Sequence, residues 1–157
     1  MNGWNRLSGE KIYDLEETLL LDIANSPTDD LKFYVGCDSQ MIKGVYFFTT
    51  ALVMLRAQSG GIAYYQKKPF AFNDLNMNHR LFLETFKAIE TATRLDPLLK
   101  CLNYKINEVH TDINPNPRFP SFEAVGACLG YIKGMGFEAK LKPEAWAATT
   151  VADYAMK

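Results

Sequence analysis

The feature that most constrains the fold is a change of hydrophobic period partway along the chain. Between residues 31 and 68, three apolar runs rich in β-branched and aromatic residues are separated by short turns, around Lys43-Gly44 and at 58–61. This pattern is typical of an antiparallel meander. From residue 75 onward, apolar residues recur at helical spacing, and strands and helices then alternate. Such an order predicts a mixed sheet with helices packed on it.

One further helix is expected before the meander. Ser8 precedes an apolar-periodic run that stops before Pro27, and these are ordinary start and stop signals of an amphipathic helix. The predicted helices cover residues 9–25, 75–95, 121–133 and 144–155, and the predicted strands cover 31–37, 45–56, 62–68, 104–111 and 137–142. No repeat is found, and apart from a Pro-rich loop at 114–117 nothing suggests a domain boundary. We therefore expect a single domain over residues 1–157.

Size and cysteine usage fit a protein of the reducing cytosol. A chain of 157 residues can bury a sizeable core without covalent staples. Cys37, Cys101 and Cys128 are odd in number, widely spaced and set among apolar residues, which fits neither a disulfide framework nor a zinc pair. No segment approaches the about 20 uncharged residues of a membrane span. We expect a soluble, cytoplasmic protein with no membrane partner.

Net charge limits how the chain could contact nucleic acid. With 17 basic and 18 acidic residues, the net charge is −1. A protein that coats nucleic acid by bulk charge needs many phosphate contacts, so this balance argues against that class. It remains compatible with an enzyme that contacts a short stretch locally.

Acidic residues stand at the ends of several predicted elements. Asp38 directly follows the first strand of the meander, Asp112 directly follows the fourth predicted strand, and Asp153 lies on the last predicted helix. Each acid alone has an ordinary explanation, as a turn former or as a solvated residue near a chain end. Their significance depends on whether the fold brings them together.

The helix predicted at 75–95 offers two more acids. Its apolar face is expected to contain Leu75, Phe82, Phe86 and Ile89. At about 100° per residue, Glu84 and Glu90 lie just outside this face on opposite borders. They cannot both serve one site, and the helical wheel does not choose between them.

Several short motifs resemble one known family. They are Gly36-x-Asp38-Ser39-Gln40, Leu83-Glu84-Thr85, His110-x-Asp112-Ile113-Asn114, Gly130-Tyr131-x-x-Gly134-x-Gly136-Phe137, Lys142-Pro143, Ala147-Ala148-Thr149-Thr150-x-Ala152-Asp153 and Lys157. By these motifs the chain is similar to the YkuK-type family of ribonuclease H-like proteins, which are predicted nucleases. The motifs run in order from residue 36 to the last residue. Asn114 departs from the glycine expected there, and Thr149-Thr150 departs from Ala-Ser or Ser-Ser, but neither departure removes a carboxylate.

The resemblance implies an α/β fold with a ribonuclease H-like mixed five-stranded sheet, flanking helices and the extra N-terminal helix. The predicted element order agrees, with three hairpin-connected strands followed by two strands reached through helical crossovers. In this fold the first and fourth strands are parallel neighbours, so Asp38 and Asp112 would lie side by side. The family pattern favours Glu84 over Glu90 as the acid of the long helix.

The resemblance also implies a metal site. Asp38, Glu84, Asp112 and Asp153 would hold two Mg²⁺ or Mn²⁺ ions, since such ions prefer carboxylate oxygens. Two ions of this kind activate a water, hold the scissile phosphate and stabilise the leaving oxygen. We therefore expect an enzyme, a metal-dependent nuclease that acts on RNA, an RNA–DNA hybrid or branched DNA. The alternative is a catalytically silent ribonuclease H-like module that binds nucleic acid or a protein partner.

Four other residues are candidates for the site. His110 precedes Asp112 by two positions, so on a strand both would face the same side, and His110 could transfer a proton or contact phosphate. A half-buried histidine satisfied by hydrogen bonds is the equally weighted alternative. Ser39 and Gln40 could bind the nucleic-acid backbone, or could be turn residues. Lys142 could attract phosphate at the end of the fifth strand, or could be a solvated lysine.

Overall fold

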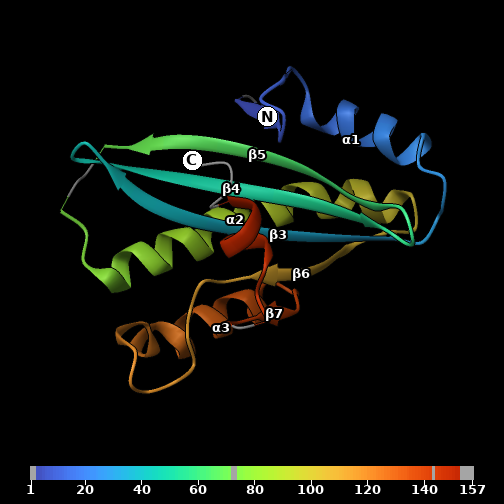
Figure 1. Ribbon diagram of the computed structural model, residues 1–157. Helices are drawn as coiled ribbons and strands as arrows, with labels where there is room; N and C mark the ends of the chain where they lie inside the picture. Colours follow the sequence, from blue (N-terminus) through green and yellow to red (C-terminus); the bar gives the residue numbers. More distant parts are fainter. Residues whose placement is uncertain (1–2, 72–73, 143, 153–157) are drawn as a thin grey trace.

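A seven-stranded mixed sheet forms the centre of the computed structural model, which describes residues 3–71, 74–142 and 144–152 (Figure 1). The strands, in spatial order, are β2 (Lys11–Ile12), β1 (Trp4–Arg6), β5 (Gly60–Phe70), β4 (Val45–Arg56), β3 (Leu31–Ile42), β6 (Ile106–His110) and β7 (Ala139–Lys140). Strands β3, β4 and β5 pair antiparallel, and β6 and β7 add to the β3 edge in parallel. The architecture is therefore the predicted combination of a meander and helical crossovers.

The turn between β3 and β4 fixes the long hairpin. Lys43 and Gly44 both adopt positive φ, at 51° and 80°, as a two-residue hairpin turn requires. Pairing is continuous from Ile42 with Val45 back to Leu31 with Arg56. The two strands thus reach well beyond the length of an average strand.

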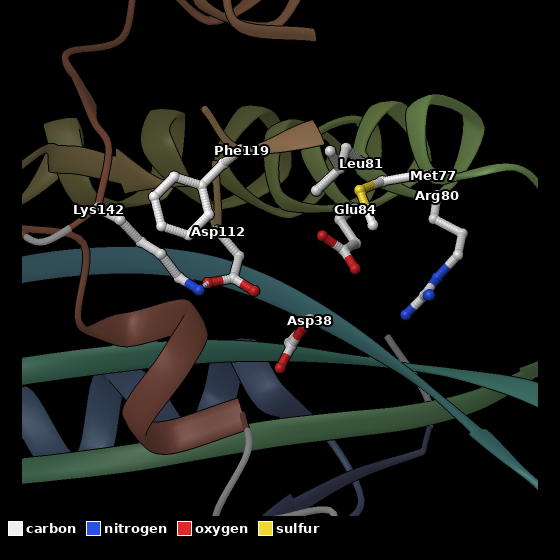
Figure 2. Close-up of a pocket in the computed structure, with 8 residues that line it drawn as sticks. All are labelled: Asp38, Met77, Arg80, Leu81, Glu84, Asp112, Phe119 and Lys142. Atoms are coloured by element: carbon white, nitrogen blue, oxygen red, sulfur yellow. Dashed lines mark ion pairs between the residues drawn. The ribbon is translucent and has the colours of Figure 1, made fainter. Parts of the chain in front are cut away.

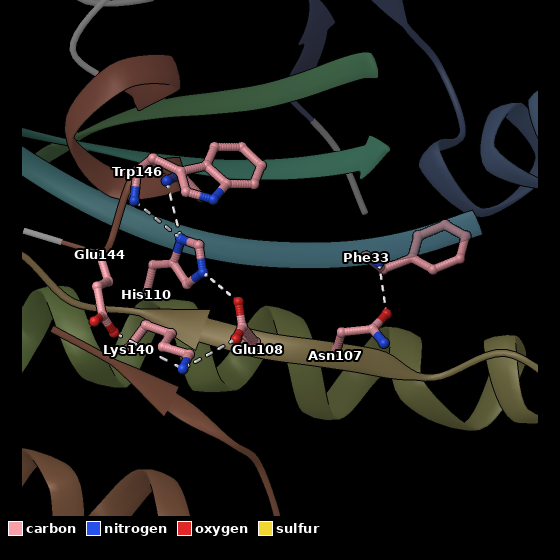
Figure 3. Close-up of polar contacts among 8 residues, drawn as sticks. Phe33, Asn107, Glu108, His110, Lys140, Glu144 and Trp146 are labelled. Atoms are coloured by element: carbon pink, nitrogen blue, oxygen red, sulfur yellow. Dashed lines mark hydrogen bonds and ion pairs between the residues drawn. The ribbon is translucent and has the colours of Figure 1, made fainter. Parts of the chain in front are cut away.

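The pairing of β3 with β6 contains one irregularity. Phe33 pairs with Ile106, but Tyr34 pairs with Glu108, so Asn107 is an extra residue on β6. The Asn107 side chain accepts the Phe33 N–H at 2.8 Å, which satisfies a donor that the ladder leaves open (Figure 3). From Tyr34 the strands stay in register to Gly36, which pairs with His110.

Three helices cover one face of the sheet. They are α1 (Leu15–Ala24), α2 (Met77–Cys101) and α3 (Val125–Gly134). An ion pair of 3.5 Å between Arg94 and Glu16 links α2 to α1, and Tyr131 on α3 packs edge-on against Phe82 of α2. Asp14 and Asn76 cap α1 and α2, because each side chain accepts a backbone N–H of the first turn.

The opposite face carries a short π-helical turn, η2 (Ala147–Ala152), which packs against β3 and β4. Trp146, just before η2, contacts the ring of Tyr34 at 4.9 Å. Ser39 on the same strand contacts α2. Neighbouring side chains of a strand alternate between faces, so odd-numbered positions of β3 face α2 and even-numbered ones face η2. A five-residue 3-10 helix, η1 (Pro120–Ala124), precedes α3.

The core lies between the sheet and helices α1 and α2. Its fully buried large side chains include Trp4, Leu15, Leu19, Phe33, Phe48, Leu52, Met54, Tyr64, Ile89, Leu95 and Leu99. Their burial explains why the first strand of the meander and the middle of α2 read as apolar runs.

Four details of the sequence prediction were wrong. The sheet has seven strands among the described residues, where five were predicted. Strands β1 and β2 were missed because they are too short to show a period. Residues 38–40 belong to β3 and form no turn, since pairing with β4 continues to Ile42. The N-terminal helix starts at Leu15, where Asp14 caps it. Of the predicted last helix, 144–155, residues 144–146 are not helical and 147–152 form the π-helical η2, while 153–155 lie outside the described residues.

The predicted apolar face of α2 also needs correction. Phe82 and Phe86 are 41% and 42% exposed, and they pack edge-on against Tyr131 at the surface and not against the sheet. The buried face consists of Leu81, Glu84, Thr85, Ala88, Ile89, Thr91, Ala92, Leu95, Asp96 and Leu99. Glu84 therefore lies inside the buried face, while Glu90 is exposed.

A partly buried polar contact joins helix α1 to strands β1 and β5, and it yields a first prediction. Asp22 accepts two bonds from Arg6, at 2.9 and 3.2 Å, and one from the buried Tyr64 hydroxyl at 2.6 Å. Asp22→Ala should lower the free energy of unfolding by about 1–3 kcal/mol, because it leaves a buried donor without a partner. Urea unfolding measures this, and Glu17→Ala on the exposed side of α1 is the control. Equal losses in both variants would contradict the prediction.

Candidate active site

A pocket opens where the parallel strands β3 and β6 part. Their last pair is Gly36 with His110, and Asp38 and Asp112 each lie two residues beyond it. In open α/β sheets, ligands bind in the crevice outside the carboxyl ends of parallel strands. The pocket has a volume of about 220 Å³. Its lining residues, drawn in Figure 2, are Asp38, Met77, Arg80, Leu81, Glu84, Asp112, Phe119 and Lys142.

Glu84 is the buried acid of the pocket, at 5% exposure. Ser39 donates a hydrogen bond to its Oε1, and its Oε2 has no hydrogen-bond partner among the described residues. Burial and the negative charge of Asp38 raise the pKa of Glu84 to about 8. In the absence of a bound cation, this carboxyl group therefore keeps its proton near neutral pH.

Ser39 connects Glu84 to a cation. Its Oγ accepts hydrogen bonds from Arg80 at 3.2 and 3.3 Å, and its carbonyl accepts a third at 3.2 Å. The Arg80 guanidinium also lies over the ring of Tyr46, 5.0 Å from the centroid. Arg80 precedes Glu84 by four residues, so both project from the same side of α2. This arrangement holds the Ser39 hydroxyl in place against Glu84.

Asp38 approaches the pocket from the other side of β3. Its neighbour Ser39 faces α2, so Asp38 faces the side of the sheet that η2 covers. One of its carboxylate oxygens accepts the Ser39 N–H at 2.9 Å. In Figure 2 its side chain points away from the carboxylates of Glu84 and Asp112. It still lines the pocket, because β6 ends two residues earlier and leaves this edge of β3 open.

Asp112 is paired with a lysine. The Lys142 ammonium lies 2.7 Å from its Oδ1, and the Lys142 backbone N–H donates to Ile113 at 3.1 Å. The two side chains are 21% and 39% exposed. Lys142 is thus held at the mouth of the pocket by both its side chain and its backbone.

The carboxylates share the pocket but do not form a compact cluster. Over residues 3–71, 74–142 and 144–152, no group of three or more His, Cys, Asp or Glu side chains is arranged to hold a metal ion. Their contacts keep them apart, because Asp112 faces Lys142, Glu84 faces Ser39, and Asp38 is turned toward the other face. The fourth expected ligand, Asp153, lies outside the described residues.

His110, the candidate for proton transfer or phosphate contact, does not line the pocket. Its ring is buried, with 1% exposure. Nδ1 accepts the backbone N–H groups of Trp146 and Ala147 at 3.2 and 3.0 Å, and Nε2 bonds to Glu108 at 3.1 Å (Figure 3). Burial lowers the pKa of His110, which favours the neutral ring that such bonding needs. The residue anchors the start of η2.

His110 and Asp112 do not share a face as expected, because side chains alternate only along a strand and β6 ends at His110. Asp112 lies in the following coil, where its side chain points into the pocket beside Lys142.

The other candidates divide between pocket and surroundings. Lys142 lines the pocket as expected. Ser39 is 6% exposed and bound to Glu84 and Arg80, so its hydroxyl faces the protein interior and is not displayed to a ligand. Gln40 is exposed on β3 and is not among the residues that line the pocket.

Sequence reasoning missed Arg80, Met77, Leu81 and Phe119. Three of them could have been found, because Met77, Arg80 and Leu81 lie one or two turns before Glu84 on the same side of α2. Phe119 lies in the loop before η1, where no periodicity signals its direction.

Comparison with known proteins agrees with the fold. The model of the family described as Ribonuclease H-like matches residues 15–157, so the chain belongs to the ribonuclease H-like family. This match and the mixed sheet confirm the predicted fold class and the resemblance. At a coarse level, the family connects the chain with nucleic acids and nucleases. No curated protein and no solved structure matches it. None of the described helices is long and apolar enough to cross a membrane.

The raised pKa of Glu84 predicts how the stability of the metal-free protein depends on pH. The carboxyl group titrates near 4.5 when unperturbed and near 8 in the fold, so folding takes up a proton between these values. Wild-type stability therefore falls as pH rises from about 4.5 to about 8. Glu84→Gln stays neutral, so its stability relative to wild type should rise over this range. The gain should reach at least about 1 kcal/mol, since one pKa unit corresponds to about 1.4 kcal/mol.

Urea unfolding in EDTA at both ends of this range measures the difference. Glu90→Gln on the exposed side of α2 is the matched control and should show no such pH dependence. A Glu84→Gln effect of the same size at both pH values would contradict the prediction.

Proposed function

We propose that this protein is a metal-dependent nuclease that hydrolyses phosphodiester bonds in RNA, an RNA–DNA hybrid or DNA. The observation that carries the proposal is the meeting of three acids from separate elements, Asp38, Glu84 and Asp112, in one pocket. The pocket lies where a ribonuclease H-like sheet opens, between its first and fourth core strands.

A purely structural role explains these acids poorly. A buried carboxyl oxygen without a hydrogen-bond partner costs free energy, and Glu84 Oε2 is such an atom among the described residues. The negative charge of Asp38 and then of Asp112 adds to this cost. The arrangement therefore lowers the stability of the fold unless a ligand binds there. A cation is the ligand that three acids suit.

The donor set fits Mg²⁺ or Mn²⁺. Carboxylate oxygens are the ligands these ions prefer, and the unpartnered Oε2 of Glu84 offers one of them from the pocket wall. Asp38, Glu84 and Asp112 would hold the ions, together with Asp153, which lies outside the described residues. When bound, two such ions would supply water activation and charge stabilisation at the leaving oxygen.

Cation binding requires changes in the protein's own groups. Glu84 must release its proton, so binding should be accompanied by proton release near neutral pH. Asp112 must exchange Lys142 for the incoming ion. Asp38 must turn toward the pocket from its bond with the Ser39 N–H.

A second candidate function is a silent module that binds nucleic acid or a protein partner. It is favoured by the Lys142–Asp112 ion pair, which already neutralises one of the acids. It is also favoured by the lack of a compact acidic cluster among the described side chains. Cleavage and metal-binding measurements separate the two functions.

The nuclease proposal predicts that Asp38→Asn and Asp112→Asn abolish cleavage. Asparagine keeps the size of the side chain but removes the charge, so rates should fall at least about 100-fold, or roughly 2.7 kcal/mol of barrier. The substrates are a single-stranded RNA, an RNA–DNA hybrid, a single-stranded DNA and a four-way junction, each with Mg²⁺ and with Mn²⁺. Circular dichroism checks that the variants fold.

Glu90→Gln is the control, because Glu90 is exposed on the same helix that carries Glu84. It should cleave like wild type. If pure wild-type protein cuts none of the four substrates, or if both aspartate variants cut as well as wild type, the nuclease proposal fails.

Lys142 gives a prediction about metal affinity. Because its ammonium occupies Asp112, Lys142→Met should bind Mn²⁺ more tightly, by about 3- to 10-fold, as expected for a competing pair worth about 1 kcal/mol. Isothermal titration calorimetry measures the affinity, and the Mn²⁺-induced rise in melting temperature checks it independently.

Lys140→Met is the matched control for this measurement. Lys140 pairs with Glu108 and Glu144 at 3.7 and 3.8 Å, and it does not line the pocket. Its removal should leave Mn²⁺ affinity unchanged. Equal or weaker Mn²⁺ binding by Lys142→Met would show that Lys142 does not compete with the ion.

A further inference from the structure

One wall of the acidic pocket is apolar. Met77, Leu81 and Phe119 line it beside the carboxylates. Met77 is 46% and Phe119 49% exposed, although both are large apolar side chains. Single exposed apolar residues are common on protein surfaces. Two of them on the wall of one charged pocket indicate a ligand with an apolar part as well as a charged one.

The backbone of Phe119 is held on both sides. Its N–H donates to the carbonyl of Asn116 at 3.0 Å, and its own carbonyl accepts the N–H of Phe122 at 3.0 Å. The ring itself remains half exposed and lies toward Lys142 and Asp112 in Figure 2. A ring fixed at its root and open on one side is suited to stacking against a flat partner.

The cations of the pocket are few and are placed apart. Figure 2 shows Lys142 and Arg80 on opposite sides of the carboxylates, and both line the pocket. A protein that follows a duplex contacts many phosphates on two strands, and the net charge of −1 does not favour this mode. Two separated cations suit two phosphates of one short strand.

We propose that the pocket binds an unpaired nucleotide of single-stranded RNA or DNA. The base stacks on Phe119 beside Met77, and the neighbouring phosphates contact Lys142 and Arg80. A base inside a duplex has both faces covered by its neighbours, so it would have to leave the stack to reach Phe119. The inference rests on the proposed nuclease function and narrows its substrate to single strands.

Fluorescence anisotropy tests the proposal by binding alone, in EDTA, so that cleavage does not interfere. The probes are labelled oligonucleotides of about 12 nucleotides, as single-stranded RNA, single-stranded DNA and the corresponding duplexes. Single strands should bind at least about 10-fold more tightly than duplexes of the same sequence. Tighter binding of either RNA or DNA identifies the preferred sugar, and each result supports the proposal.

Phe119→Ala should weaken single-strand binding by about 10-fold or more, because one stacked base is lost. The melting temperature should stay the same, since the ring is half exposed. Phe119→Trp should restore the affinity, which a merely structural role of the phenylalanine would not require. Phe86→Ala is the matched control, because Phe86 is also an exposed phenylalanine, at 42%, and does not line the pocket.

The salt dependence separates stacking from charge. With two phosphate contacts, the logarithm of the binding constant should fall against the logarithm of salt concentration with a slope of about −1.4. Phe119→Ala should leave this slope unchanged. Lys142→Gln should reduce it by about 0.7, because one phosphate contact is lost.

Equal binding of duplexes and single strands would overturn the proposal, as would an equal loss of affinity in Phe119→Ala and Phe86→Ala. A failure of this inference can be distinguished from a failure of the nuclease proposal. A protein that binds single strands through Phe119 but cuts no substrate refutes the nuclease proposal alone. A nuclease that cuts single strands and hybrids equally well, with or without the Phe119 ring, refutes this inference alone.

Discussion

The extra residue Asn107 in β6 sets the register on which the candidate active site depends. Before it, Phe33 pairs with Ile106, and after it the pairing is shifted by one residue, so that Gly36 faces His110. A shift of one residue moves every following side chain of a strand to the other face. Without the bulge, Glu108 and His110 would not face η2, and Asp38 would lie level with Thr111 instead of Asp112. The hydrogen bond from the Phe33 N–H to the Asn107 side chain stabilises this register.

The pocket that follows contains one costly group, and its surroundings limit the cost. Glu84 is held as a neutral acid by burial, and the Ser39 hydroxyl bonds to one of its oxygens. Arg80 fixes that hydroxyl from outside the core, while its guanidinium packs on Tyr46. The metal-free protein thus avoids a buried negative charge without supplying a full set of partners to Glu84. The remaining unsatisfied oxygen belongs to a side chain that lines the pocket, so an incoming cation would supply the partner that it lacks.

The sequence predicted the layers and the order of the elements, because 45–56 is a continuous apolar, β-rich run and α2 carries apolar residues at helical spacing. It also predicted that Asp38, Glu84 and Asp112 belong to one region, although for Glu84 only the family motif decided this. The helical wheel predicted the wrong buried face for α2. Phe82 and Phe86 are apolar but lie at the surface, where they contact Tyr131. The bulge at Asn107 and the ring of Phe119 left no pattern in the sequence, since each is fixed by a single tertiary contact or loop.

Strand β6 connects the pocket with the last part of the chain. On the face toward η2, His110 accepts the N–H groups of Trp146 and Ala147, and Glu108 orients the ring from the other side. The first N–H groups of a helical turn have no partner within it, so a neutral imidazole acceptor stabilises the start of η2 at this point. Two residues further along, the same strand leads into Asp112. One short strand, β6, thereby positions both Asp112 and His110, the anchor of the segment that leads toward Asp153. A change in the register of β6 would displace both residues together.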